Sequence, residues 1–330
     1  MDTKLTVSLS PHIHSRNSID HCMWNVIIAL IPALVVAVWT FGLQALLVIG
    51  ISVAACLLTE GLIDRFLFHR HLSLSNGSAI ITGILLAFNL PSILPWWMVV
   101  IGAVVAIGIG KMSFGGLGCN IWNPALVGRV FLLISFPAAM TTWPVDVPSG
   151  IGHITGATGT DANTGATLLA SLNDYSYGKI GLDNVDFMDM AIGHMNGSLG
   201  EVGSVAILIG LAYLLITKVI TWHIPVSMIA SAALFSWAFG GNPVLDIFAG
   251  GLLLGAVFMA TDYVTSPMTR QGQIIYGFMI GFITIVIRRY GSYPEGVSFA
   301  ILLMNSFTPI INRYCHPRLF GRRKTSAVKA

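Results

Sequence analysis

Charged residues are scarce in this chain. Asp, Glu, Lys and Arg make up 9% of its 330 residues and hydrophobic residues make up 55%, and the mean hydropathy is +0.80. An ordinary soluble domain has about a quarter of its residues charged. So few charges cannot cover a water-exposed surface, and we therefore expect an all-α polytopic membrane protein. A net charge of only +3 gives no indication of nucleic-acid binding.

Cysteine is also rare, and its spacing excludes several kinds of site. The cysteines are far apart and form no C-x-x-C pair, so we predict no metal or iron–sulfur site ligated by this chain alone. Cys119 lies in a Gly-rich turn and could meet a partner's cysteines around a shared cluster, but we predict a small buried hydrophobe there. A G-x-G-x-x-G motif in a suitable context is absent as well, so dinucleotide binding is not expected. The four cysteines are Cys22, Cys56, Cys119 and Cys315.

Long apolar runs, by contrast, are abundant, and ten of them are candidates to cross a bilayer. The third run is short for ~30 Å of hydrocarbon, so either it is a broken half-helix or the residues from Leu72 onward contribute to it. The predicted spans are 22–41, 43–63, 77–90, 94–110, 123–140, 199–217, 222–240, 244–261, 272–290 and 296–312. The predicted organisation is an N-terminal segment 1–21, a five-helix repeat 22–140, a polar loop 141–198, a second five-helix repeat 199–312 and a basic tail 313–330.

The distribution of Lys and Arg predicts the orientation, because these residues concentrate on the cytoplasmic side. With ten spans both termini lie on one side, which would hold most of the basic residues, including those of the tail. The other side would hold only Lys179, Arg288 and Arg289. We therefore predict a bacterial inner-membrane protein with both termini cytoplasmic and the 141–198 loop outside. For Arg288 and Arg289 we expect a pairing with an acidic group on the outer side.

The two halves read alike, with five spans and one Gly/Pro/polar interruption each. The interruptions are 113–124 and the segment from Thr261 to Gly272, and we take them as equivalent positions. Because five is odd, a duplicated half must enter the membrane with the opposite topology. We therefore expect inverted repeats, with a site near mid-membrane where the interruptions meet.

A polar loop at Asp161-Ala-Asn-Thr-Gly-Ala-Thr167 stands out from the apolar pattern. Small residues before Thr167 let another molecule approach the backbone and leave its hydroxyl as the protruding, modifiable group. The pattern Asp-x-x-Thr-Gly-Ala-Thr resembles the flavinylation motif of the RnfD/NqrB family, whose last Thr carries FMN through a phosphoester. By that resemblance Thr167 is the attachment residue, and its companions in the motif are Asp161, Thr164, Gly165 and Ala166.

A second Thr-Gly-Ala-Thr lies nine residues upstream and ends at Thr158. The position that corresponds to Asp161 is Gly152 there. Thr158 is followed by Gly159, whereas the family pattern continues into apolar residues as the chain does after Thr167. The pattern therefore favours Thr167 over Thr158, with an inert surface loop as the alternative to either.

The resemblance to the RnfD/NqrB family covers nearly the whole chain, and the length favours the RnfD branch. It rests on the Thr167 motif and on Ser10-Pro-His12, Asn120-x-x-Asn-Pro124, Ala260-Thr-Asp-Tyr-Val-Thr-Ser-Pro267 and Gly296 to Asn305. It implies a flavin-carrying subunit of an ion-translocating ferredoxin:NAD⁺ oxidoreductase that moves Na⁺ or H⁺. It also implies partner subunits that hold the NAD⁺ and ferredoxin sites, and a flavin transferase for maturation. The isolated chain is not expected to be catalytic, and a second, non-covalent flavin such as riboflavin is an open alternative.

Acidic residues inside spans are costly, which makes them candidates for an ion route. Asp262 is the strongest, because neighbouring hydroxyls and amides can replace the water shell of a small cation. The alternative is that Asp262 caps a helix and pairs with Arg270. For Glu60 we expect an interfacial pairing with Arg65. The predicted ion route consists of Asp262, Thr261, Asn120 and Asn123.

Two other classes of function compete with the electron carrier. A stand-alone transporter or channel of the same repeat fold would move its substrate in liposomes without partners and would carry no flavin. A non-redox scaffold subunit would keep the complex active when Thr167 is replaced.

The motif at Thr167 predicts a covalent flavin. The purified, denatured chain should keep yellow in-gel fluorescence and carry about one FMN minus water on the peptide that contains Thr167, as mass spectrometry would show. A modified Thr158 with a bare Thr167 would contradict the site, and an unmodified chain co-expressed with a competent flavin transferase would contradict the carrier function.

Overall fold

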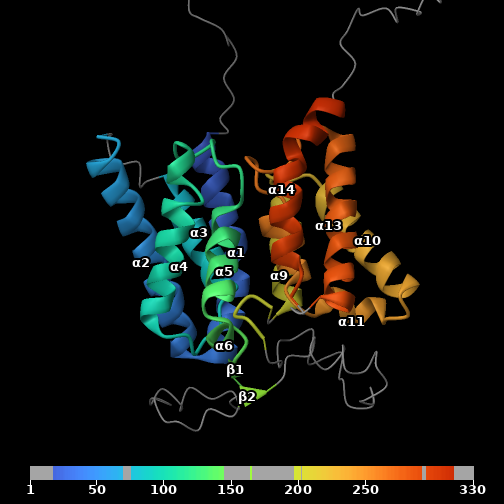
Figure 1. The fold of residues 1–330 in the computed structure, drawn as a ribbon, viewed down its shortest axis with the longest axis horizontal. Coiled ribbons are helices and arrows are strands. Elements are labelled where there is room, and N and C mark those ends of the chain that lie inside the picture. The colour runs from blue at the N-terminus through green and yellow to red at the C-terminus, as the bar shows by residue number, and fades with distance from the viewer. Residues whose placement is uncertain are drawn as a thin grey trace, which may run out of the picture.

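The computed structural model describes residues 18–69, 76–144, 164–165, 197–201, 203–291 and 295–315, and within them the chain is almost entirely helical. Figure 1 shows the blue-to-green helices of the first half beside the yellow-to-red helices of the second. The first half contains α1 (Ile19–Phe41), α2 (Leu43–Phe66), α3 (Ser78–Phe88), α4 (Trp96–Gly108), η2 (Met112–Phe114), α5 (Pro124–Ser135) and α6 (Pro137–Met140). The second contains α9 (Ser204–Ile216), α10 (His223–Ala238), α11 (Pro243–Phe248), α12 (Leu252–Leu254), η3 (Gly255–Met259), α13 (Arg270–Tyr290) and α14 (Val297–Tyr314).

The helices present apolar side chains outward as well as inward, which is the pattern of helices surrounded by lipid. Trp39, Leu58 and Ile216 are exposed by 71%, 67% and 79%. Within the described part of the chain, four segments are long and apolar enough to cross a membrane: α1, α2, α13 and Trp96–Phe114, which contains α4. Shorter apolar helices pack among them. The chain is therefore a multi-pass membrane protein.

Two predicted spans differ from the helices that form. The run 123–140 is divided at Phe136 into α5 and the short α6. The run 244–261 is wrong as a single helix, because it breaks at Gly250 and Gly251, whose φ angles of 71° and 65° are readily adopted only by glycine. It continues as α12 and then as the π-helical turn η3, a rare form that is frequent at functional sites.

Helix α3 is short. One of the two expectations for the third predicted span was such a half-helix. Its 11 residues reach about 16 Å, roughly half of the ~30 Å hydrocarbon layer. The segment from Leu72 that could have extended it lies outside the described residues. Among the described residues, each half of the chain thus contains an element that is too short to cross the hydrocarbon layer. These elements are α3 in the first half and the α12–η3 pair in the second.

The expected equivalence of the two interruptions is wrong. Residues 113–124 follow α4, the fourth helix of the first half, whereas 261–269 follow η3, the third membrane element of the second. Helix α3 packs against α2 just as η3 packs against α10. By its place in the order of elements, the turn after α3, which begins at Asn89, corresponds better to 261–269 than 113–124 does. Both interruptions nevertheless come together, because the halves also meet through α1 with α9 and α5 with α14.

The described part of the chain begins and ends at the same end of the bundle. In Figure 1 the start of α1 and the end of α14 lie at the top, and we call this the termini end. The opposite end carries β1 (Trp143–Pro144) and β2 (Thr164–Gly165), and we call it the loop end. These two strands pair antiparallel, with Trp143 opposite Gly165. Thr164 and Gly165 of the motif from Asp161 to Thr167 thus have their backbone at the loop end, while Asp161, Ala166 and Thr167 lie outside the described residues.

Helices α2 and α3 touch through Gly83. A Cβ at this position would come within 2.7 Å of the Val53 Cα, and the Ser52 hydroxyl donates a hydrogen bond to the Gly83 carbonyl at 2.8 Å. Small residues allow this approach between helices in a membrane, where close packing replaces hydrophobic association.

Replacement of Gly83 by Ala should therefore destabilise the protein by about 1–3 kcal/mol, because the new methyl group meets backbone rather than a flexible side chain. The matched control is Gly50→Ala in α2, where nothing lies within 4 Å of the added Cβ and Ala should stabilise the helix by about 0.5–1 kcal/mol. Thermal unfolding in detergent measures both, and equal midpoints would contradict the close contact.

Candidate functional site

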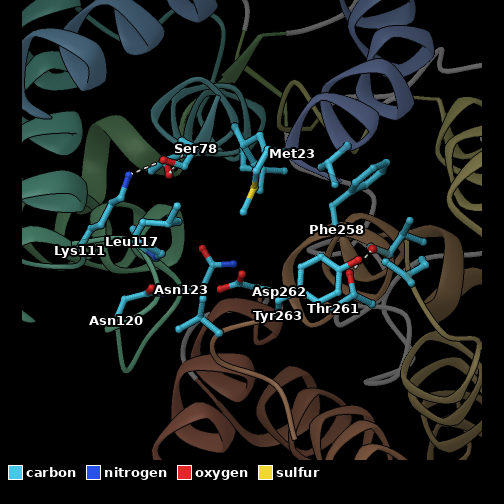
Figure 2. A pocket seen from close by; sticks show the side chains of 18 of the residues that line it. Met23, Ser78, Lys111, Leu117, Asn120, Asn123, Phe258, Thr261, Asp262 and Tyr263 are labelled. Carbon is cyan, nitrogen blue, oxygen red and sulfur yellow. Dashed lines mark hydrogen bonds between the residues drawn. The ribbon is translucent and has the colours of Figure 1, made fainter. Parts of the chain in front are cut away.

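A cavity lies at the termini end, between the two halves. Its lining includes Met23 of α1, Ser78 of α3, Asn123 just before α5, and Phe258 of η3. Figure 2 shows these side chains around one space, with Asp262 close to Asn123 and with Lys111 on the other side. The four residues predicted for the ion route all line this cavity: Asp262, Thr261, Asn120 and Asn123.

Asp262 is held by short-range hydrogen bonds in the turn after η3. The Thr265 hydroxyl donates to its carboxylate at 3.2 Å, and the Asn120 side chain is a further partner. The Thr308 hydroxyl on α14 donates to the Thr265 carbonyl at 2.9 Å and fixes the turn. Arg270 is not among the ion-pair partners found for the described residues. The alternative pairing of Asp262 with Arg270 is therefore wrong, and the carboxylate stays half-buried at the cavity wall.

Asn123 joins the two halves. Its side-chain nitrogen donates to the Met259 carbonyl at 3.2 Å, and its side-chain oxygen accepts the Ala125 N–H at 3.1 Å as the N-cap of α5. Thr261 donates its hydroxyl to the Val257 carbonyl at 2.6 Å. Both side chains thus have structural partners, although an amide or hydroxyl oxygen keeps a second lone pair for a ligand.

Glu60 and Lys111 form a buried ion pair at the cavity wall. The Lys111 ammonium lies 2.7 Å from the Glu60 carboxylate and donates to the Ser78 hydroxyl, also at 2.7 Å. Glu60 and Lys111 are each exposed by only 2%. The expectation that Glu60 pairs with Arg65 at the interface is wrong, since Glu60 faces inward and Arg65 lies exposed.

A second group of buried charges lies at the loop end. Arg129 of α5 donates to the Asn89 side chain at 2.5 Å and forms an ion pair with Glu295. Glu201 interacts electrostatically with both Arg129 and Arg288. We call this set the loop-end cluster: Asn89, Arg129, Glu201, Arg288 and Glu295. This cluster joins the two halves of the chain. Asn89 and Arg129 belong to the first half, and Glu201, Arg288 and Glu295 come after the first half in the sequence.

The two arginines that break the charge pattern have partners at this end. Arg289 pairs with the Asp246 carboxylate at 3.1 Å, as the expected pairing with an acidic group required. Arg288 is exposed by 2% and donates to the carbonyls of Asp246, Ala249 and Gly250. It thereby satisfies the carbonyl groups where α11 ends.

An apolar layer surrounds Gly200 and the end of α3. Phe88 and Leu254 both touch Gly200, where an added Cβ would lie 2.7 Å from each side chain. Phe88, Leu254 and Met259 are buried. The lining of the cavity includes no member of the loop-end cluster.

The family follows from comparison with known proteins. The chain matches the NQR2, RnfD, RnfE family over residues 6–321. It belongs to this family. It is 43% identical over 330 residues to a protein of Clostridium ljungdahlii named as a subunit of the proton-translocating ferredoxin:NAD(+) oxidoreductase complex, with 97% of each chain covered. It is 44% identical to a protein of Acetobacterium woodii named as a subunit of the Na(+)-translocating ferredoxin:NAD(+) oxidoreductase complex, covering 98% of this chain and 97% of that one.

A third relative is named without an ion. It comes from Stutzerimonas stutzeri, is named as a subunit of an ion-translocating oxidoreductase complex, and is 39% identical with 93% of both chains covered. All three relatives carry the same subunit designation within their complexes. The relatives named for H⁺ and for Na⁺ are about equally similar to this chain, so similarity alone does not select the ion.

The four residues predicted from the sequence for the ion route line one cavity of this family member, but the prediction did not include Lys111 or its partner Glu60. Lys111 was not singled out in the sequence, although an ionisable residue among apolar neighbours is itself a functional signal. Glu60 was assigned to the surface because its partner is 51 residues away in the chain. Both belong with Asp262, on whose carboxylate the Lys111 charge also acts.

Replacement of Arg129 by Met should destabilise this family member by about 3–5 kcal/mol, because buried carboxylates lose their cationic partner. Adding Glu295→Gln should recover part of that loss. Exposed Arg65→Met is the matched control and should stay within about 0.5 kcal/mol of wild type. Thermal unfolding of the four proteins decides it, and independent, additive losses at 129 and 295 would contradict the pairing.

Proposed function

We propose that this chain is the flavin-carrying membrane subunit of an ion-translocating ferredoxin:NAD⁺ oxidoreductase complex. The observation that carries the proposal is the match along almost the entire chain to relatives that are named as one and the same subunit of such complexes. The motif Asp161 to Thr167 supports FMN covalently attached at Thr167. The bound flavin supplies electron transfer, and the chain supplies its tether and position.

The proposed architecture is a pair of inverted five-helix repeats with both termini cytoplasmic. Corresponding packing supports the repeat, with α2 against α3 and α4 in one half and α10 against η3 and α13 in the other. The shared location of the start of α1 and the end of α14 (Figure 1) supports termini on one side. The scarcity of Lys and Arg in the 141–198 loop supports an outer position for that loop.

The proposed ion route begins in the cavity at Asp262. A half-buried carboxylate with amide and hydroxyl oxygens around it matches the oxygen ligands that hard cations take, and it can also take up a proton. The half-length α3 and η3 border the cavity, which is the arrangement that places ion sites inside transporters. Either Na⁺ or H⁺ could use such a group.

The same cavity is also a candidate for a second, non-covalent flavin such as riboflavin. Met23, Leu85 and Phe258 give it apolar walls, and the amides of Asn120 and Asn123 lie at its edge. Organic cofactors bind in this combination of apolar surface and few polar groups. The amides would hold a ring edge by hydrogen bonds, and the flavin would supply a further electron carrier.

Ion coupling and flavin attachment should be separable, since the cavity lies at the termini end and β2 lies at the loop end. Asp262→Asn removes a negative charge with little change in shape, so ion transport by the assembled complex should weaken while covalent flavin stays at wild-type content. Thr167→Ala should instead abolish covalent flavin and ferredoxin-to-NAD⁺ electron flow while the protein still inserts. Ion uptake in proteoliposomes and flavin content measure the two effects.

The control is Asp20→Asn, which removes an exposed carboxylate from the first turn of α1 without touching the cavity. Asp20→Asn should leave ion uptake unchanged. Unaltered ion uptake and unaltered cation dependence in flavinylated Asp262→Asn would contradict the ion route. Full electron flow in Thr167→Ala would favour the scaffold, and ion transport by the isolated chain in liposomes would favour the stand-alone transporter.

A further inference from the structure

The Lys111 ammonium is an internal cation at the wall of a site proposed to bind an external one. Lys111 follows α4, and its two partners belong to other helices, Glu60 to α2 and Ser78 to α3. These contacts come from three elements and are buried. The ammonium is therefore held at a fixed place in the wall.

The charges around this place do not balance. Asp262 and Lys111 line the cavity, and Glu60 is bound to Lys111. These three groups carry two carboxylates and one ammonium. Cys56 is near Glu60 and Lys111 but is a neutral thiol in its protonated form. Asp64 is buried four residues along α2 from Glu60 and has an interaction of its own, so it is not counted with these three groups. One negative charge is in excess, and a buried charge without a partner is costly.

We propose that Lys111 is a tethered competitor for the cation that binds at Asp262, and that Glu60 sets the affinity of that site by holding Lys111. The inference rests on the proposed cation site at Asp262. While Glu60 neutralises Lys111, the cavity keeps one excess negative charge and takes one monovalent positive charge, Na⁺ or H⁺. When Glu60 is neutral, the Lys111 charge is left to act on Asp262 and opposes the external cation.

The flexible stem of lysine suits this role. Lysine carries a compact charge on four methylene groups, whereas the planar guanidinium of arginine is held in a rigid fork. The Lys111 charge already acts on the Asp262 carboxylate from its place beside Glu60. Lys111 and Glu60 are thus positioning residues, since they act on the cation through the field at Asp262 and do not bind it.

Three variants test the charge balance in the assembled, flavinylated complex. Glu60→Gln keeps the shape of the side chain and leaves Lys111 uncompensated, so the Na⁺ concentration for half-maximal ferredoxin-to-NAD⁺ activity should rise at least about tenfold. Lys111→Met should lower that concentration. Glu60→Gln combined with Lys111→Met removes both charges, restores the excess of one negative charge, and should reverse most of the shift caused by Glu60→Gln.

The same variants titrated with pH at vanishing Na⁺ distinguish the two ions. If the bound charge is a proton, the shifts appear in the pH titration and not in the Na⁺ titration. Glu60→Gln should then lower the pH midpoint, because weaker proton binding needs a higher proton concentration, and Lys111→Met should raise it. Covalent flavin content and thermal unfolding are recorded for each variant. A merely structural ion pair would lower the unfolding temperature of Glu60→Gln without moving either midpoint.

The competitor role is overturned if Glu60→Gln leaves both midpoints in place, or if the double variant is shifted further than Glu60→Gln. Asp262→Asn separates this result from the proposed function. If Asp262→Asn weakens cation dependence while Glu60→Gln does not, only the role of Lys111 fails. If Asp262→Asn has no effect, the cation site itself is absent and the proposal fails with it.

Discussion

The structure depends on one constraint, which is that a polar or charged group inside a bilayer must find its partner within the protein. Two groups of buried charges meet this constraint, one at each end of the bundle. At the termini end Lys111 lies between Glu60 and Ser78, and at the loop end Arg129 lies between Asn89 and Glu295. Each group draws side chains from several helices, so the same contacts that satisfy the charges also fix how the helices pack.

Between these charged groups the chain places half-length helices. Helix α3 ends at Phe88, and α12 begins at Leu252, so the backbone of both halves is broken where the apolar layer lies. Broken helices leave backbone groups that need partners, and the structure supplies them from nearby segments. Gly200 donates its N–H to the Phe88 carbonyl at 2.8 Å, and Asn123 donates to the Met259 carbonyl at 3.2 Å. The apolar layer is thus held by hydrogen bonds as well as by apolar packing.

The positions of most helices could be predicted from the sequence, because apolar runs bounded by polar residues mark membrane helices directly. The gathering of Asp262 with Asn120 and Asn123 was also predicted, although through an equivalence between interruptions that is wrong. The pairing of Glu60 with Lys111 and the break at Gly250 could not be predicted in the same way. A pairing across 51 residues depends on how helices pack, and a glycine break looks the same in sequence as a glycine inside a helix.

The short reach of α3 has an electrical consequence. Its 11 residues cover about 16 Å of a hydrocarbon layer ~30 Å thick, and the cavity occupies the termini end beside it. On the proposed ion route, water in this cavity would concentrate the transmembrane voltage across the remaining thickness of the bilayer, where the full potential corresponds to about 2.3 kcal/mol per elementary charge at 100 mV. For that proposed route, the voltage would act little on the entry of a cation to Asp262 and mainly on its passage beyond Phe88 and Leu254.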